Sequence, residues 1–310
     1  MLCRYPVTDL TQPRMQATIL RELVLPNLPS ASGVELVGEQ AYIVGDDSPL
    51  LYQLNAASLV AGQPTTLFET AHFSTGRIPK AEKPDLECLT ALTLPSGETG
   101  LLAFASGSAP IREIGFWVPL LHGSATVYPL ALGPLYRLLR ARLSAGISLN
   151  LEAAAATATE LWLFQRGIGV GAQNLVFRLP LGPALDFIRL RTAQPPTIRQ
   201  QVLQLPTVAG HPAGLSGATW YDGRLFVTAS AEDTLDPVAD GAVLGSLVGV
   251  AEAGKDPAWV PLVQPNGQPY LRKVEGVAVR QRLGRGHYEL LLVTDDDAGG
   301  STALIATLRV

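Results

Sequence analysis

The sequence predicts an all-β chain of many short strands joined by turns, and three observations favour this class. Of its 310 residues, 30 are glycine and 24 are proline, more turn-forming residues than a helical bundle usually contains. Hydrophobic residues make up 47% of the chain and charged residues 16%, so it can bury a core and is not intrinsically disordered. The third observation is an internal repeat, which organises the strands.

The repeat consists of a short segment that usually contains a glutamate, followed by a strongly apolar strand that ends in polar residues. It recurs five times, at intervals of about 60 residues. One position of the repeat is occupied, in chain order, by Glu35, Glu87, Glu152, Ser216 and Glu275. The apolar strands that follow lie at 41–47, 101–108, 160–167, 224–230 and 289–297.

Each repeat has room for four strands. Third strands are predicted at 50–54, 111–120, 174–181, 243–250 and 302–310, and fourth strands at 65–69, 125–132, 198–205 and 258–263. The last repeat ends at Val310, and the apolar segment 17–25 can supply its missing strand. Because an open ring leaves two unpaired edges, we predict a single β-propeller domain over 1–310, with five four-stranded blades closed by 17–25. A sixth, degenerate blade within 133–149 is the alternative.

Two segments have helical character. Residues 152–160 are rich in alanine and have high helix propensity, but their place in the repeat predicts a strand. Residues 135–143 have helical spacing and lie outside the repeat, so we expect a short helix or a hairpin there.

Composition argues against several classes of protein. The net charge of −4 and the pI of about 5.6 argue against a general nucleic-acid binder, which is usually basic. The two cysteines cannot form a disulfide framework or a CxxC zinc site. Residues 115–136 lack charge, but three prolines interrupt them, so we predict buried strands and no membrane span. With no secretion signal in the N-terminal residues, we expect a soluble cytoplasmic protein.

The repeated acids form the first candidate site. If they lie on the innermost strands, Glu35, Glu87, Glu152 and Glu275 converge on the central channel, with Ser216 in the fifth place. Carboxylates gathered in this way repel one another unless a cation binds, some are protonated, or basic residues pair with them. The basic candidates for ion pairing or ligand binding are Lys80, Lys83, Arg166 and Lys273. A structural role is the alternative, in which the acids bind backbone amides of the neighbouring blade.

A second acidic set follows the apolar strands of the first and last repeats. It comprises Asp46, Asp47, Asp295, Asp296 and Asp297. Ring closure would make these two blades neighbours, so the carboxylates could share a Ca²⁺ ion. The alternative is turn chemistry, which also favours Asp beside Gly and Pro.

The motifs at 32–35, 46–47, 150–153, 214–217, 274–277 and 295–296 together resemble the phytase-like β-propellers described as having "esterase-like activity of phytase". Residues 79–89 resemble an uncharacterised bacterial family related to them. The resemblance implies calcium ions that bind and polarise phosphate, assisted by Lys or Arg. The metal candidates it implies are Glu35, Asp46, Asp47, Glu275 and Asp295 to Asp297. The phosphate candidates it implies are Lys80, Lys83, Arg166 and Lys273.

Two functional hypotheses follow from different classes. The favoured one is a non-catalytic module whose channel mouth binds a small molecule or an ion, with Ca²⁺ as the candidate metal and no organic cofactor. The alternative is a calcium-dependent phosphoesterase. The sequence contains no G-x-S-x-G, H-E-x-x-H or phosphate-binding G-K-[ST] motif, which favours the binding module.

Overall fold

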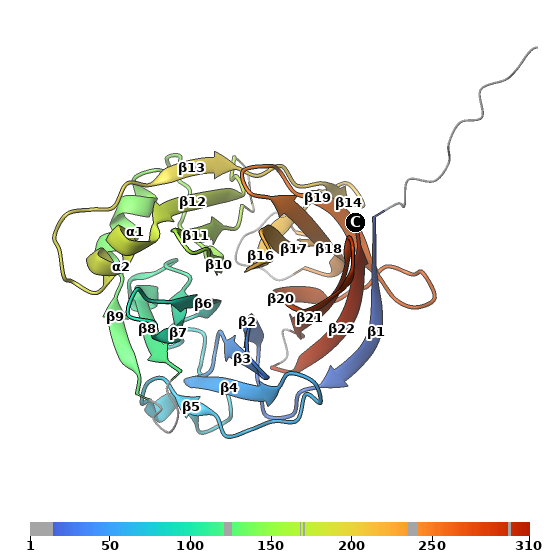
Figure 1. The fold of residues 1–310 in the computed structure, drawn as a ribbon, viewed down its shortest axis with the longest axis horizontal. Coiled ribbons are helices and arrows are strands. Elements are labelled where there is room, and N and C mark those ends of the chain that lie inside the picture. Colours follow the sequence, from blue (N-terminus) through green and yellow to red (C-terminus); the bar gives the residue numbers. More distant parts are fainter. Residues whose placement is uncertain (1–14, 121–125, 168, 170, 235–240, 297–298) are drawn as a thin grey trace, which may run out of the picture.

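The computed structural model describes residues 15–120, 126–167, 169, 171–234, 241–296 and 299–310. These residues form mainly β-strands, which confirms the all-β prediction. Antiparallel sheets surround a central axis and are arranged as the blades of a β-propeller (Figure 1).

Most strands belong to four-stranded antiparallel units whose members follow one another along the chain. The units are β2 (Ala31–Val37), β3 (Gln40–Gly45), β4 (Leu50–Asn55) and β5 (Thr65–Thr66); β6 (Leu86–Thr93), β7 (Thr99–Ala105), β8 (Ile114–Pro119) and β9 (Tyr128–Ala131); β10 (Leu151–Ala156), β11 (Glu160–Gln165), β12 (Leu175–Pro180) and β13 (Arg199–Val202); and β16 (Gly214–Tyr221), β17 (Arg224–Glu232), β18 (Val243–Glu252) and β19 (Ala258–Val263).

The last strands of the chain form a unit together with the first. It contains β20 (Lys273–Gly284), β21 (His287–Asp295), β22 (Ser301–Arg309) and β1 (Gln16–Val24). Strand β1 pairs antiparallel with β22 over most of its length and makes two parallel pairs with β19. The N-terminal strand therefore lies between the last blade and the one before it (Figure 1).

The innermost strands contact one another around the axis: β2 with β6 and β20, β10 with β6 and β16, and β16 with β20 (Figure 1). We call the face at which these strands begin the N-face and the face at which they end the C-face. The space between them is only about 10 Å³, close to the volume needed for one water molecule. A ligand would therefore bind at a mouth of the channel and not within it.

Middle strands are apolar on both faces because each blade packs against two neighbours. In β7, every residue from Gly100 to Ala105 is buried. One core cluster joins the second and third units and includes Phe104, Tyr136 and Phe177. The Tyr136 hydroxyl donates a hydrogen bond to the Ala105 carbonyl at 2.6 Å, which satisfies the one polar atom of this buried ring.

Two α-helices lie in the connections. The segment expected to form a helix or a hairpin contains helix α1 (Gly133–Arg140), whereas α2 (Leu181–Ile188) was not predicted. The alanine-rich segment forms strand β10, as its place in the repeat predicted. The short remaining elements are η1 (Ala71–Phe73), η2 (Pro110–Arg112), β14 (Thr207–Val208) and β15 (His211–Pro212).

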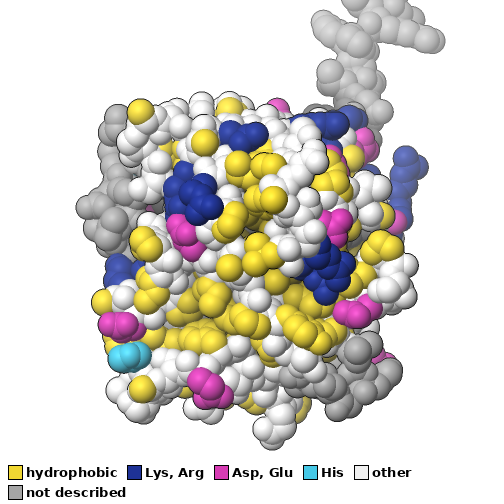
Figure 2. All heavy atoms as spheres, turned by 90° about the vertical axis from the view of Figure 1, so that its left-hand side faces the viewer, with side chains coloured by type: hydrophobic (Ala, Val, Ile, Leu, Met, Phe, Trp, Pro, Cys, Tyr) yellow, Lys and Arg dark blue, Asp and Glu magenta, His cyan; other side chains and the backbone are white. Residues whose placement is uncertain are grey.

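The helices lie on the outer side of the ring, which Figure 2 shows from outside. Hydrophobic and charged side chains are interspersed there, and Tyr128 of β9 is 51% exposed. Neither α1 nor α2 nor any other helix in the described ranges has the length and hydropathy needed to cross a bilayer.

Candidate metal centre at the channel mouth

A β-bulge near the start of each innermost strand determines where the repeated side chain points. In β6, β10, β16 and β20, the pairing with the next strand shifts at Glu87, Glu152, Ser216 and Glu275. A bulge redirects the side chain of the extra residue. These three glutamates line the same narrow space at the N-face, as the repeat predicted.

Glu35 does not belong to this group. In β2 the pairing shift falls between Ala31 and Val34, so Ser32 corresponds to Glu87 and Glu35 lies further along the strand. The repeat alignment that equated Glu35 with the other glutamates is therefore wrong. The Glu35 carboxylate lies towards the C-face, where it accepts hydrogen bonds from the backbone N–H of Leu36 at 2.9 Å and of Ala91 at 3.4 Å. The sequence pattern did not show which residue of β2 is bulged.

Ser216 has a structural role at its bulge. It is 1% exposed, and its hydroxyl donates to the Val274 carbonyl of the next blade at 2.5 Å. Thr228 Oγ1 lies 3.2 Å from the same hydroxyl. These contacts join two blades and leave Ser216 no access to a ligand.

Two basic residues lie beside the glutamates and offset their negative charge. Arg166, which follows β11, is 5% exposed; its Nη2 donates to Glu232 at 3.0 Å and its Nη1 lies 3.7 Å from Glu152. Lys273 Nζ lies 2.7 Å from Glu275. Although burial opposes its charge, the pKa of Lys273 is raised well above its usual value by the carboxylate of Glu275. Arg166 and Lys273, two of the four predicted phosphate candidates, are thus held in ion pairs.

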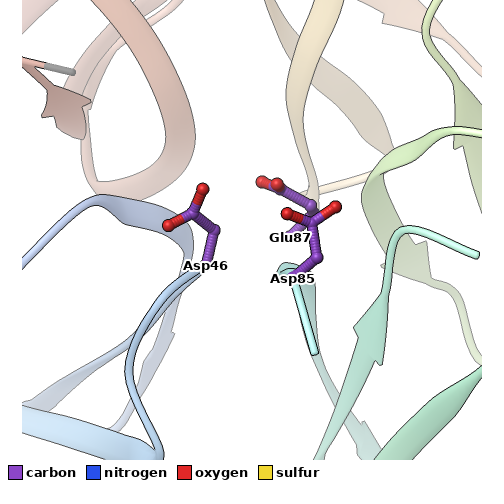
Figure 3. Close-up of side chains that lie close together, drawn as sticks. All are labelled: Asp46, Asp85 and Glu87. Atoms are coloured by element: carbon purple, nitrogen blue, oxygen red, sulfur yellow. The ribbon is translucent and has the colours of Figure 1, made fainter. Parts of the chain in front are cut away.

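Three carboxylates from two neighbouring blades meet beside these pairs (Figure 3). Asp46 follows β3, Asp85 directly precedes β6, and Glu87 occupies the β6 bulge. One oxygen of each lies within 4.8 Å of the others. Asp85 adopts a positive φ of 63°, which Asp tolerates better than most residues. The loop geometry and the bulge together bring the three side chains to one point.

Among the described residues, basic side chains and hydrogen-bond donors contact two of the three carboxylates but not the third. Lys83 Nζ contacts Asp46 and lies 3.0 Å from Asp85. Asp85 also accepts from Arg112 at 2.7 Å and from Ser106 at 2.6 Å. The Glu87 carboxylate, by contrast, makes neither an ion pair nor a hydrogen bond with any residue in the described ranges.

Burial raises the pKa values of two of these carboxyl groups, Asp46 and Glu87. Burial raises the pKa of Asp46 to about 6, despite the opposing effect of Lys83. Burial also raises the pKa of Glu87 well above its usual range, and the charges of Glu152 and Asp85 raise it further. An additional cation at this point would favour the ionised form of both groups.

The rest of the predicted acidic rim is arranged around Arg77. The Asp47 carboxylate accepts from Arg77 Nε at 2.5 Å and from Ser30 Oγ at 3.1 Å. Burial opposes the charge of the Arg77 guanidinium. The nearby carboxylates of Asp47 and Asp295 nevertheless raise the pKa of Arg77 above its usual value. Asp46 and Asp47 are adjacent in sequence but have different partners, because Asp46 faces Lys83.

Two further candidates, Asp296 and Lys80, are not members of the three-carboxylate cluster. Asp296 accepts a hydrogen bond from the backbone N–H of Gly300 at 2.6 Å, a turn contact of the type expected from the alternative interpretation. Asp297 lies outside the described residues. Lys80 is exposed, and its carbonyl accepts from Arg112.

Sequence reasoning missed Asp85, Arg112 and Glu232 as members of the N-face cluster. One signal was present for Asp85: residues two apart on a strand share a face, and Asp85 and Glu87 have that spacing. Arg112 lies in a connection between strands, and Glu232 lies at the end of a strand. At such positions neither the residue spacing nor the repeat indicates which charged residue each will contact.

Comparisons with known proteins identify the family but not an activity. A model of a family of unknown function, DUF6929, matches residues 27–308. The chain belongs to this family. A search of curated proteins found no significant match. Because the family has no assigned activity, the resemblance to phytase-like propellers stays a prediction.

Two solved structures are similar to the chain at low identity. The Cps50 (Swd1) β-propeller domain of Myceliophteria thermophila is 9% identical, with a TM-score of 0.34; the match covers 90% of this chain and 68% of that one. Drosophila Plexin A, in complex with Semaphorin 1b, is 11% identical with a TM-score of 0.41, covering 94% and 76%. At these values neither structure informs the function of this chain.

Proposed function

We propose that the protein binds a calcium ion at the N-face mouth of its channel, through Asp46, Asp85 and Glu87. The observation that carries this proposal is that three carboxylates lie within 4.8 Å of one another, while Glu87 makes no direct ion pair or hydrogen bond with a described residue and feels Lys83 and Arg166 only at longer range. Carboxylates at this distance repel one another, and a hard divalent cation relieves the repulsion through the oxygen ligands it prefers.

The ligand set suits calcium better than magnesium. Ca²⁺ binds oxygen at about 2.3–2.6 Å in flexible geometry, so opposite ligands can be roughly 5 Å apart. Mg²⁺ requires about 2.0–2.1 Å and near-octahedral geometry, so it tolerates a narrower range of side-chain positions. Asp46 offers a further acceptor, because its Oδ1 is buried and has no hydrogen-bond partner.

Lys83 and the metal compete for the same oxygens. The Lys83 ammonium contacts Asp46 and Asp85, and its side chain is 13% exposed. Calcium binding therefore requires this side chain to move towards solvent, which would weaken the affinity. A moderate affinity that rises when Lys83 is removed is the expected behaviour.

Isothermal titration with CaCl₂ and, separately, MgCl₂ tests the proposal. We expect one calcium site, weaker binding of magnesium, and a melting temperature that rises with calcium by mass action. Glu87→Gln should lower calcium affinity about tenfold or more, because a neutral amide is a weaker ligand. The control is Asp222→Asn, which removes one carboxylate from an exposed turn elsewhere. Equal calcium binding by wild type and Glu87→Gln would refute the assignment.

Phosphoester hydrolysis at the same site is the second candidate. It is supported by the ammonium of Lys83 beside the three carboxylates, a cation that could contact a metal-bound phosphate once displaced. A bound calcium would polarise the phosphate, and Lys83 would neutralise part of its charge. Turnover of p-nitrophenyl phosphate that depends on calcium and is lost in Glu87→Gln would support hydrolysis. Calcium binding without turnover would support a non-catalytic binding module instead.

We also propose that the four-stranded units are five blades of a complete ring, that residues 1–310 form one domain, and that β1 closes it. The pairing of β1 with β22 along the last blade supports closure. Deleting residues 1–26 should expose the edge of β22 and cause unfolding or aggregation. A truncated protein that melts at the same temperature as the full chain would contradict closure by β1.

A further inference from the structure

A cavity of about 650 Å³ opens at the C-face, at the opposite end of the channel from the candidate metal centre. It lies between the ends of β2, β16 and β20, and its size falls within the range of small-molecule sites. Its lining includes Glu35, Thr219, Trp220, Tyr221, Arg280 and Glu289. Neither the calcium proposal nor the hydrolase alternative uses it.

The cavity contains a buried carboxylate without a cationic partner. Glu35 is 8% exposed, and within the described part of the chain its oxygens accept only from the backbone N–H groups of Leu36 and Ala91 and from the Thr219 hydroxyl at 3.4 Å. Among the described residues it forms no ion pair. A buried carboxylate in this state is costly to ionise, and burial raises the pKa of Glu35 to about 7.

The charged groups around Glu35 do not supply the missing cation. The charged side chains that line the cavity are Glu35, Glu39, Arg280 and Glu289. Arg280 donates hydrogen bonds to Glu289 at 2.8 Å and to the carbonyls of Ala56 at 3.0 Å and Ala57 at 3.2 Å. Its guanidinium is therefore already paired with a carboxylate other than Glu35. The lining therefore has excess negative charge, which favours a cationic ligand.

The ring of Tyr221 forms an apolar wall of the cavity. It lies edge-on to Phe226 at 6.5 Å, and the side chain is only partly buried, so it still offers surface to a ligand. Trp220, the preceding residue of β16, points to the opposite face of the sheet and packs against Trp162, with ring centroids 5.4 Å apart. A fixed aromatic surface beside a carboxylate suits a ligand that has an apolar body and a positive head.

We propose that this cavity binds a primary organic ammonium ion with an aromatic body, its ammonium paired with Glu35 and its ring against Tyr221. The ammonium supplies the cation that Glu35 lacks, and the ring displaces water from the apolar wall. The negative lining rejects organic anions, and a neutral analogue would leave Glu35 uncompensated.

Binding of this ligand should depend on pH. The ammonium favours ionised Glu35, which is a minority of the free protein below pH 7 and a majority above it. Affinity should therefore rise about tenfold between pH 6 and pH 8, because a proton must leave Glu35 when the ligand binds at low pH. The neighbouring Thr219 hydroxyl and backbone amides do not titrate in this range.

The test uses 2-phenylethylammonium and its neutral isostere 2-phenylethanol, titrated calorimetrically at pH 6 and pH 8 with saturation-transfer NMR as a second readout. We expect the ammonium to bind at least about tenfold more tightly than the alcohol at pH 8. Glu35→Gln should abolish both this preference and the pH dependence, while Glu252→Gln, a change at an exposed site elsewhere, should leave both intact. Thermal melts verify that each variant folds.

Three outcomes would overturn the proposal. The first is no binding of 2-phenylethylammonium at 10 mM, and the second is equal binding of the ammonium and the alcohol. The third is an unchanged preference in Glu35→Gln. Tyr221→Leu keeps an apolar side chain without the ring and should weaken both probes by a similar factor, which separates the ring contact from the ion pair.

Discussion

The two ends of the channel hold buried carboxylates in opposite ways. At the N-face, Glu152, Glu232 and Glu275 surround Arg166, and Lys273 pairs with Glu275. At the C-face, Glu35 has no ion pair with a described residue and accepts hydrogen bonds from two backbone amides and a hydroxyl. The N-face is thus an ion network with one unpaired member, Glu87, whereas the C-face holds an isolated acid beside a cavity.

This difference shows that a strand bulge decides the role of a glutamate in this fold. Glu87, Glu152 and Glu275 occupy bulges and point into the N-face cluster. Glu35 lies beyond the bulge of its strand and therefore reaches the other mouth. Similar sequence motifs consequently build two chemically different sites.

The largest expected effect is the loss of Arg166. Arg166→Met should lower the free energy of unfolding by about 4 kcal/mol, because removing one partner leaves buried charges uncompensated. Urea unfolding at pH 7 measures it. Arg282→Met removes a guanidinium from an exposed pair with Asp222 and should cost at most about 1 kcal/mol. Similar losses in the two variants would contradict the view that the N-face network is held together by a buried cation.

The next effect concerns Lys83, which neutralises the carboxylates of the candidate metal centre. Lys83→Met should lower the free energy of unfolding without calcium by about 3 kcal/mol, because Asp46 loses its cation and Asp85 one of its two. The same variant should bind calcium more tightly, since no side chain competes with the metal. Lys255→Met, at an exposed pair, should change neither quantity. A variant that is destabilised and binds no calcium would leave only a structural ion network at the N-face.

The fold was largely predictable because its signal is local and repeated. Strand β19 has the predicted bounds, and β10 forms in spite of helix propensity because flanking blades bury it. Helix α2 was missed because it lies in a connection outside the repeat. The site was less predictable: the contact of Asp46 with Asp85 and Glu87 depends on a positive φ, a bulge and the packing of two blades, none of which a sequence motif specifies.

The contrast between the two mouths also predicts how stability changes with pH. The pKa of Glu35 is about 7 in the folded protein and near its ordinary value of 4.5 when unfolded, so the folded state holds its proton more tightly. Its contribution is fully present below pH 4.5 and is lost as the pH rises to 7. Glu35→Gln cannot ionise and should be about 3 kcal/mol more stable than wild type at pH 8, with little difference at pH 4.5. Urea unfolding at both pH values measures this, and a Gln variant that is less stable at pH 8 would contradict an uncompensated Glu35.

The smallest expected effect concerns Ser216, a bulge residue that carries no charge. The Ser216 hydroxyl donates to the Val274 carbonyl, which Ser230 also approaches at 3.3 Å, so the carbonyl keeps a donor when Ser216 is removed. Ser216→Ala should therefore lower the free energy of unfolding by about 1 kcal/mol. Adding Ser230→Ala should cost more than the sum of the two single changes, because the buried carbonyl then has no side-chain donor. Additive losses would show that the two hydroxyls act independently, and that a bulge in this ring matters chiefly through the charge it carries.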